Sequence, residues 1–504
     1  MATSASSTEE RANMSHDLVE SASSDTVAVK DSMTPGSQRD DPEAKIDQPA
    51  FVGLPQNRFH EAAFILVVCC AQLMTQAGLS LSIAPLQIIS DSFNTTPKDL
   101  SWASAGYSLT VGTFIFVSGR LGDEDSLYGP IRDFSTAVVH FKALGQPYCY
   151  RTPLQSLEGH TPPGRRKEMV FCLFGAVAPG GFTLGAAFSS LLAERVWWPW
   201  GYWIFGIACF IFAVLGYFSI PYVPQQKPCE DLSIFERLDT YGAITGVSGL
   251  ILINFAWNQA SLVGWGVPYT YVMLIVGVLI MALFLFLESK AAYPLLPRSV
   301  LVGEAGWVLG CIAAGWSSFG VVVFYYYNIL EVLEGNSGLL VTAKWAGASL
   351  SGACAAVITG LLLGRISASI IIFVAMLAFS AGQALLASMP IGQVYWANAF
   401  VIMLITPWGM DMSFPSGIVI LSNAMPQQDQ GVAGSLVNTV VNYSISMGLG
   451  FAGVVEYYVG NDGENVLVGY RAASYTGVGL AGLGTIIATC FMLVTWRDSR
   501  KASS

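Results

Sequence analysis

Long uncharged runs of apolar residues recur along most of the chain, and short polar segments separate them. A membrane-spanning helix needs about 20 mostly apolar residues. Each run is long enough for one such helix, and the runs at 241–287 and 366–410 are each long enough for two. The predicted helices lie at about 62–85, 99–119, 168–193, 198–220, 239–258, 266–287, 305–328, 339–363, 367–388, 394–421, 432–456 and 474–496. The pattern predicts an all-α polytopic membrane protein with twelve visible apolar spans, because backbone groups in lipid must satisfy one another.

The composition agrees with a membrane protein. Hydrophobic residues make up 53% of the 504 residues and charged residues only 12%, whereas a soluble domain carries about 25% charged residues. The net charge is −10, and much of the acid lies near the N-terminus, which is rich in Ser, Thr, Asp and Glu. We therefore predict that residues 1–58 form a disordered tail. The net charge itself says little about nucleic acid, and we expect no nucleic-acid partner.

The basic residues predict the orientation of the spans. With the N-terminus in the cytosol, most Lys and Arg side chains between helices fall on the cytoplasmic side, including Arg365 and Arg497, whereas the outer loops keep mainly Arg195 and Arg471. This distribution agrees with the positive-inside rule. The predicted parts are a cytoplasmic tail at 1–58, an N-terminal transmembrane half at 59–220, a cytoplasmic connector at 221–238, two extra central helices at 239–288, a C-terminal transmembrane half at 289–497 and a cytoplasmic tail at 498–504.

Signatures of enzymes and metal sites are missing from the chain. No HExxH, GxSxG or P-loop pattern occurs, and the nine cysteines show no CxxC or His/Cys ligand spacing. We therefore expect no catalytic site and no metal. Asn94, which starts an Asn-Thr-Thr sequence, is a candidate glycosylation acceptor if its loop faces outward.

Asp411 is the sharpest candidate for a functional residue. It lies within the apolar span 394–421, between Pro407 and Pro415 and two residues after Gly409. A carboxylate at membrane depth is costly and by default marks a transport pathway or a proton relay. Removal from water disfavours its charged form, which suits reversible protonation. We expect the prolines and the glycine to break the helix there, so that freed backbone groups line a cavity. The alternative is a structural acid paired with a partner in the bundle.

Amide side chains inside other predicted spans are further candidates for the pathway. Gln72 and Gln76 are four residues apart and share one face of the first helix, and Asn438 and Asn442 share a face in the same way. Asn254 adds another amide at membrane depth. Contact with substrate and a hydrogen bond between helices are equal alternatives for the glutamine pair.

Two short motifs resemble those of a known transporter superfamily. The first comprises Gly119, Arg120, Gly122 and Asp123. The second comprises Gly175, Pro179, Gly180 and Gly181. The first resembles the cytoplasmic gating-loop motif of the major facilitator superfamily, and the second resembles the antiporter motif of its fifth helix. Small residues also let another helix approach closely, so helix packing is an alternative role for the second motif.

Two longer stretches make the resemblance more specific. The segments 407–415 and 436–446 are similar to those of fungal fourteen-helix drug:proton antiporters of the aminotriazole-resistance type. The resemblance implies the major facilitator fold, with Asp411 as the candidate proton site. It also implies export of small toxic compounds by alternating access, driven by a proton gradient and without a cofactor.

The chain departs from this family between its second and third predicted helices. Residues 123–167 are polar, and the fifth-helix motif follows them directly, so helices three and four of the expected fourteen are missing or frame-shifted. Degenerate codons for 137–161, read in another frame, permit an apolar helix with the RxxQG start of the superfamily's fourth helix. We therefore hypothesise that residues 131–160 are that helix translated in the wrong frame. The segment 82–86 also replaces the family's acidic motif in the first helix.

The sequence thus predicts a transporter, not an enzyme, that exports small toxic compounds or drugs in exchange for protons. Two alternatives remain open: a uniporter or importer of a small solute, and a membrane scaffold, receptor or inactive truncated product that transports nothing. The predicted partners are a small-molecule substrate and the lipid bilayer, and we expect a monomer. The plasma membrane is favoured over the vacuolar membrane.

Overall fold

The computed structural model of the protein describes residues 58–95, 101–123, 163–219, 239–291, 294–295, 303–424, 430–461 and 463–503. The chain divides into Met1–Ala50, which lies outside these ranges, and Phe51–Ser504, which contains every element below. The predicted connector at 221–238 and the segment hypothesised to be frame-shifted, 131–160, also lie outside the described residues. Their interpretation stays a prediction.

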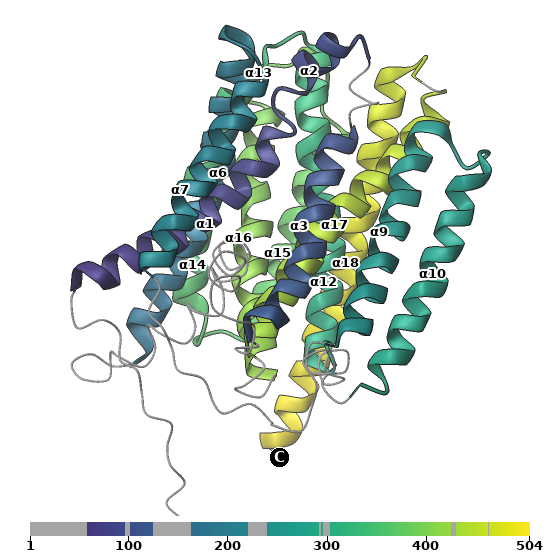
Figure 1. Ribbon diagram of the computed structural model, residues 1–504. Helices are drawn as coiled ribbons and strands as arrows, with labels where there is room; N and C mark the ends of the chain where they lie inside the picture. Colours follow the sequence, from purple (N-terminus) through teal and green to yellow (C-terminus); the bar gives the residue numbers. More distant parts are fainter. Residues whose placement is uncertain are drawn as a thin grey trace, which may run out of the picture. The chain divides into compact units, whose positions relative to one another are not determined.

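The described residues form helices joined by turns (Figure 1). In chain order they are α1 (Arg58–Leu81), α2 (Leu86–Phe93), α3 (Ser101–Asp123), α6 (Pro163–Arg195), α7 (Pro199–Ser219), α9 (Thr240–Val263), α10 (Pro268–Glu288), α12 (Glu304–Asn328), the π-helical segment η1 (Ile329–Leu333), α13 (Gly338–Trp345), α14 (Gly347–Leu362), α15 (Ala368–Ala387), α16 (Asn398–Ala424), α17 (Gln430–Val459) and α18 (Val466–Ser503). These elements confirm the predicted all-α fold class.

The lengths and apolarity of the helices fit a membrane protein. In the described part, eight helices are long and apolar enough to cross a membrane, and a ninth is added if α1 and α2, bent by 45°, count as one span. Three more, α3, α16 and α17, have 23, 27 and 30 residues. A multi-pass membrane protein is therefore confirmed, whereas the count of twelve spans stays a prediction.

The first predicted helix begins and ends four residues earlier than expected. We predicted 62–85, but α1 ends at Leu81 and the following four residues form a turn. In this turn the Ser82 hydroxyl donates to the Leu79 carbonyl at 2.7 Å, and Pro85 disfavours helical backbone in the residue before it. Both effects end the helix early.

The expectation that α16 is broken around Asp411 is wrong. The helix runs without interruption from Asn398 to Ala424, with Pro407 and Pro415 inside it. Each proline removes one backbone donor, but α16 packs along α14 and α15, which keep its axis in place. The carbonyls that lose their helical donor therefore lie within a continuous helix. Membrane helices tolerate such prolines where neighbouring helices support the backbone.

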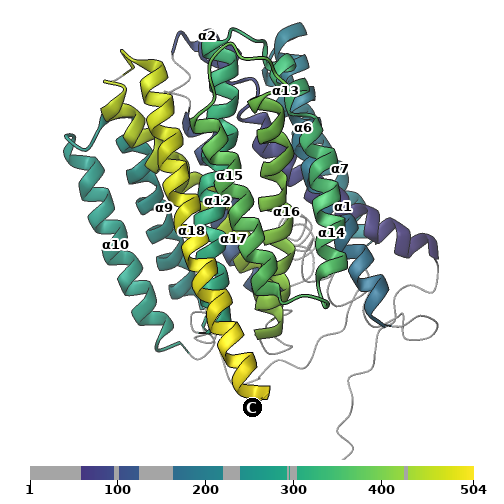
Figure 2. The same cartoon turned by 180° about the vertical axis from the view of Figure 1, so that it is seen from behind.

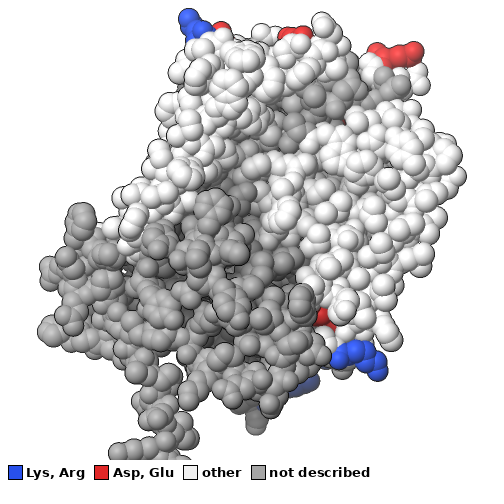
Figure 3. All heavy atoms as spheres, viewed as in Figure 1, with Lys and Arg blue, Asp and Glu red and all other residues white. Residues whose placement is uncertain are grey.

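On one face of the molecule, the exposed charged side chains of the described residues lie at the two ends of the bundle (Figure 3). On the face shown in Figure 3, the Lys, Arg, Asp and Glu atoms of the described residues lie at the two ends, and uncharged atoms occupy the band between them. Large apolar side chains are exposed on the spanning helices, among them Phe210 on α7 and Leu279 on α10, which are 60% and 63% exposed. Lipid is the solvent that such a band requires.

The two transmembrane halves meet mainly along two pairs of helices, and α6 also packs on α13 and α16. The helix α6 packs on α14, and α3 packs on α17 (Figures 1 and 2). Within the N-terminal half α1 packs on α6 and α7, and within the C-terminal half α12 packs on α15, α16, α17 and α18. The extra helix α9 packs on α10, α17 and α3. Figure 1 shows the C-terminus at one end of the bundle and α2 and α13 at the opposite end, which we call the distal end.

Candidate transport site

Asp411 is a buried acid with an unsatisfied oxygen. It lies midway along α16 and is only 5% exposed. Its Oδ2 atom is enclosed and has no hydrogen-bond partner in the part of the chain that the structure describes. Burying an ionised carboxylate costs several kcal/mol, and an oxygen without a hydrogen-bond partner gains nothing that offsets this cost. Among the described residues this oxygen has no bundle partner, and a role of Asp411 in a transport pathway stays a prediction.

The carboxyl group of Asp411 lies where three helices come together. A Cβ atom placed on Gly352 of α14 would overlap Asp411 Oδ2 on one side and the ring of Pro179 on the other. Pro179 belongs to α6, in the N-terminal half, whereas α14 and α16 belong to the C-terminal half. Only glycine at 352 allows this approach, so Asp411 borders the contact between the halves.

Serine side chains join the same three helices. Ser349 Oγ lies 3.1 Å from the Pro179 carbonyl and 2.7 Å from the Thr183 hydroxyl, and these contacts link α14 to α6. Ser351 donates to a carbonyl of α16 at 2.6 Å and accepts from Trp408 Nε1 at 3.1 Å. The helix α14 is thus bound to the opposite half on one face and to the Asp411 helix on the other.

The small residues of the antiporter-like motif are used mainly for close packing. A Cβ on Gly181 would overlap the backbone of Leu73 on α1, and a Cβ on Gly175 would lie 3.3 Å from Ala356 on α14. No atom lies within 4 Å of the corresponding position on Gly180. The close helix approach expected of this motif is present, while its role in antiport stays a prediction.

Known proteins similar to this chain define its family. The chain is 48% identical over 473 residues to the low affinity ammonium transporter of Saccharomyces cerevisiae, with 89% of this chain and 92% of that protein covered. It is 36% identical to the major facilitator superfamily multidrug transporter mdr3 of Aspergillus fumigatus, with 89% and 84% covered. The chain belongs to the major facilitator superfamily. The aminotriazole resistance protein of S. cerevisiae, 34% identical with 88% and 86% covered, supports the resemblance to fungal drug-efflux transporters.

Solved structures agree on the fold. The major facilitator chain superposes on PepTSo, a POT family transporter, with a TM-score of 0.54 at 12% identity, and 89% of this chain and 100% of that one are covered. Similarity at this level of identity shows the fold alone. None of the family models compared with the chain matches it. The relatives and structural neighbours are named as transporters, which agrees with the expectation of a transporter.

The glutamines of this facilitator's first helix lie beside a helix contact. Gln72 is 9% exposed and Gln76 is partly buried. Neither amide makes a hydrogen bond within the described residues. The neighbouring residues Leu73 and Ala77 pack on the glycines of α6. Among the described residues, no hydrogen bond joins either glutamine to Asp411. A role of the two glutamines in a transport pathway therefore stays a prediction.

Asn254 joins helices and does not lie beside Asp411. It is fully buried on α9, where its Oδ1 accepts from Ser446 Oγ and from Asn258 Nδ2, each at 2.9 Å. Ser446 Oγ also lies 2.9 Å from the Ala105 carbonyl, so that α17 is linked to both α9 and α3. These contacts favour a hydrogen bond between helices as the role of this amide.

The second amide pair lies on the other contact between the halves. Asn438 and Asn442 are 8% and 7% exposed, and Asn442 Nδ2 donates to the Asn438 carbonyl at 2.9 Å. A Cβ on Gly112 of α3 would lie 3.3 Å from Asn442 Cβ and 3.2 Å from the Thr439 carbonyl. The pair therefore lies close to α3, and any substrate contact stays a prediction.

The gating-loop motif and the glycosylation candidate have clear places in the backbone. The residues Gly119, Arg120, Gly122 and Asp123 form the end of α3, and their side chains lie outside the described part. Asn94 ends α2 in the left-handed region, with φ 54°, which asparagine tolerates better than most residues. Its backbone role explains the residue type, whereas glycosylation stays a prediction.

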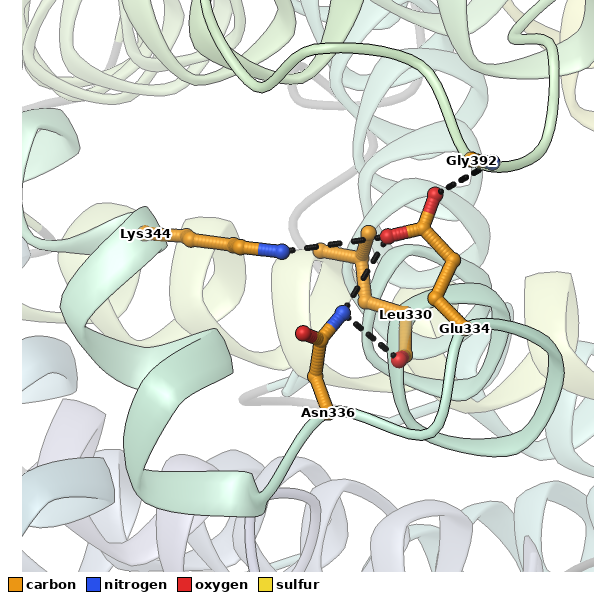
Figure 4. Close-up of polar contacts among 5 residues, drawn as sticks. All are labelled: Leu330, Glu334, Asn336, Lys344 and Gly392. Atoms are coloured by element: carbon orange, nitrogen blue, oxygen red, sulfur yellow. Dashed lines mark hydrogen bonds and ion pairs between the residues drawn. The ribbon is translucent and has the colours of Figure 1, made fainter.

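A polar cluster at the distal end was not anticipated. Figure 4 shows Glu334 accepting from the Gly392 amide at 3.0 Å and from Asn336 Nδ2 at 3.1 Å, with Lys344 Nζ 3.8 Å from the carboxylate. Asn336 also donates to the Leu330 carbonyl at 3.0 Å. The cluster ties the end of η1 to α13 and to the turn before α16.

Glu331 is a second buried acid that the sequence analysis missed. It lies in η1, is 9% exposed, and its Oε1 has no hydrogen-bond partner among the described residues. A Cβ on Gly338 would lie 3.2 Å from this oxygen and 3.3 Å from Ser190 Oγ of α6. In the sequence Glu331 directly follows an apolar run, a position typical of the end of a spanning helix. A π-helical turn, common at functional sites, was not visible in the sequence.

Proposed function

We propose that this major facilitator protein exports a small molecule in exchange for protons, and that Asp411 carries the proton. The observation behind the proposal is the carboxyl group at the α6–α14 contact, 5% exposed and with an unpartnered oxygen. A group so placed is close to both halves, so its charge affects how stably they pack. This is the property that couples a proton to alternating access.

The proposed cycle uses the change in hydration at Asp411. While α6 and α14 are packed, water is excluded and the neutral acid is the stable form, because an isolated charge there costs several kcal/mol. When the halves separate along α6 and α14, water reaches the carboxyl group, hydrates the anion and accepts the proton. The α6–α14 contact closes again after the Asp411 carboxylate takes up a proton from the solution on the opposite side of the membrane. Release of the proton and binding of substrate then alternate.

The substrate class follows from the relatives and is part of the proposal. The aminotriazole resistance protein and the multidrug transporter mdr3 favour a small toxic heterocycle. A second candidate is ammonium, because the relative that is 48% identical is named a low affinity ammonium transporter. Both are small, nitrogen-containing solutes, and each can be offered separately in a flux assay.

Flux in proteoliposomes tests the proposal. The full chain is reconstituted, a pH gradient is imposed, and movement of labelled aminotriazole or labelled methylammonium is followed. Asp411→Asn keeps the size of the side chain but cannot release a proton, so we expect gradient-driven flux to be lost while insertion is unchanged. Asp498→Asn, at an exposed position near the end of α18, is the matched control.

Three outcomes would contradict the proposal. Gradient-driven flux of Asp411→Asn equal to that of Asp498→Asn would remove Asp411 from the coupling. Absence of flux of every solute in the unaltered chain, with normal insertion, would instead favour the non-transporting alternative. Uphill flux that ignores the pH gradient would favour another energy source.

A further inference from the structure

Glu331 and Ser190 place two unpartnered polar groups at the distal contact between the halves. Glu331 lies in η1, in the C-terminal half, and Ser190 lies in α6, in the N-terminal half. They are 9% and 0% exposed, and Glu331 Oε1 and Ser190 Oγ have no hydrogen-bond partner within the described part of the chain. Enclosed polar atoms without a partner are uncommon and point to a further role. The proposed cycle uses neither residue.

Oxygen atoms from both halves gather around Gly338 at the start of α13. A Cβ on this glycine would lie 3.2 Å from Glu331 Oε1, 3.3 Å from Ser190 Oγ and 2.7 Å from the Ala84 carbonyl. Ala84 belongs to the turn between α1 and α2, so two of the three oxygens come from the N-terminal half. A methyl group would already overlap the carbonyl, so this point has no room for a metal ion. A proton needs no such room.

A second acid faces this contact from the N-terminal half. Glu194 of α6 accepts from the Leu339 amide of α13 at 2.9 Å, and its charge repels a negative charge on Glu331. Among the described residues, no Lys or Arg forms an ion pair with Glu331. The lysine of α13, Lys344, lies instead 3.8 Å from the Glu334 carboxylate. An ionised Glu331 therefore has a like charge near it and no paired cation.

The other titratable groups that act on Glu331 are tyrosines. Tyr327 of α12 and Tyr470 of α18 interact with it electrostatically. A tyrosine is neutral below about pH 10, and the Tyr327 hydroxyl already lies 3.3 Å from the Thr342 hydroxyl. These rings do not supply the positive charge that an ionised Glu331 needs.

We propose that Glu331 binds a proton at the distal contact, and that the neutral acid is the form in which the halves close there. The protonated carboxyl group has one O–H donor, and Ser190 Oγ and the Ala84 carbonyl are acceptors on the opposite half. When the proton passes from the carboxyl group to water at the distal end, the anion is left beside Glu194. The closed contact then becomes less stable than an open, hydrated one.

This proton site is separate from Asp411. Asp411 lies where α6, α14 and α16 meet, whereas Glu331 lies in η1 beside α13, α6 and the turn before α2. As a second proton in the exchange, Glu331 rests on the proposed function. Opening of the distal contact can nevertheless be measured with no solute and no pH gradient, so failure of this site and failure of export are distinguishable.

Distances between spin labels at the distal end, measured over a series of pH values, test the proposal. Val196, just after α6, and Val394, before α16, are 65% and 71% exposed, so labels there leave the packing intact. The full chain in lipid nanodiscs, in a background without other accessible cysteines, should populate longer distances as the pH rises. One coupled proton changes the ratio of open to closed forms by at most about tenfold per pH unit.

The variants assign this response to one carboxyl group. Glu331→Gln has no proton to release, so we expect it to stay closed at alkaline pH. Glu464→Gln, at an exposed acid between α17 and α18, should respond as the unaltered protein does. Glu194→Gln still accepts from the Leu339 amide but carries no charge, so it should open less at alkaline pH than Glu464→Gln.

Several results would overturn the site. The first is a distance distribution of the unaltered protein that does not change with pH, and the second is an equal response of Glu331→Gln and Glu464→Gln. If Glu331→Gln does not fold, Glu194→Gln decides: less opening at alkaline pH supports the site, and an unchanged response overturns it. A response lost in Asp411→Asn but kept in Glu331→Gln assigns the proton to Asp411 alone. A distal response without gradient-driven flux would support this site and count against the proposed exporter.

Discussion

Gly352→Ala is the change that most directly probes the contact between the two halves. The added Cβ would overlap Asp411 Oδ2 and the Pro179 ring, and would come within 2.9 Å of Pro179 Cβ. The Asp411 side chain can rotate away, but the proline ring is fixed to the backbone of α6. The helices α6 and α14 must therefore move apart, or the packed arrangement must bear the strain.

The size of the effect follows from these contacts. Overpacking by one methyl group typically costs about 1–3 kcal/mol. Because the overlap exists only while α6 and α14 are packed, this cost acts on one conformation and shifts the balance between packed and separated states by about 5- to 150-fold. Alanine also stabilises a helix by about 1 kcal/mol relative to glycine. Gly180→Ala has the same helix gain but no atom within 4 Å of the new Cβ, so it is the matched control.

Distances between spin labels on the two helices measure the shift. Phe188 on α6 and Leu350 on α14 are 62% and 73% exposed, so labels there leave the packing intact. In a background without other accessible cysteines, Gly352→Ala should populate longer distances than Gly180→Ala. If both variants give the same distance distribution as the unaltered protein, the close contact of Asp411, Gly352 and Pro179 does not control the separation of the halves.

Three further variants test the polar links within the bundle. Ser446→Ala removes hydrogen bonds from α17 to α9 and α3, including that to Asn254 at 2.9 Å, and should lower stability by about 1–3 kcal/mol in thermal unfolding; an unchanged transition would contradict the link. Glu334→Ala should destabilise the distal end more than Lys344→Gln, because the 3.8 Å ion pair is partly exposed and weak, whereas the carboxylate also accepts from Gly392 and a side-chain amide. Equal unfolding temperatures for these two variants would refute that ranking.

Burial of Asp411 was predictable, and its surroundings were not. An acid inside a long apolar run must be buried or lie beside water, and the structure confirms that it is buried at 5% exposure. The expected helix break was wrong because neighbouring helices support α16 through both prolines. The contact with Pro179 joins segments far apart in the chain, and no local pattern reports such a contact.

The amides show the same limit in another way. A span such as α9 is apolar nearly all round, so its sequence does not indicate which face points to lipid, to a cavity or to another helix. Asn254 and Gln72 look alike in the sequence, because each is an amide in apolar surroundings with a second amide four residues later. In the structure, Asn254 bonds to Ser446 across helices, whereas Gln72 makes no hydrogen bond among the described residues.

The sequence by itself determined that this is a multi-pass helical membrane protein, because lipid requires about 20 apolar residues per crossing and helices that satisfy their own backbone. Its motifs also indicated the superfamily. Only the tertiary structure decided which polar groups meet: Asp411 with Gly352 and Pro179, and Glu456 with Tyr325. The physical reason is that spanning requires only apolarity and length along one helix, whereas a site depends on how several helices pack together.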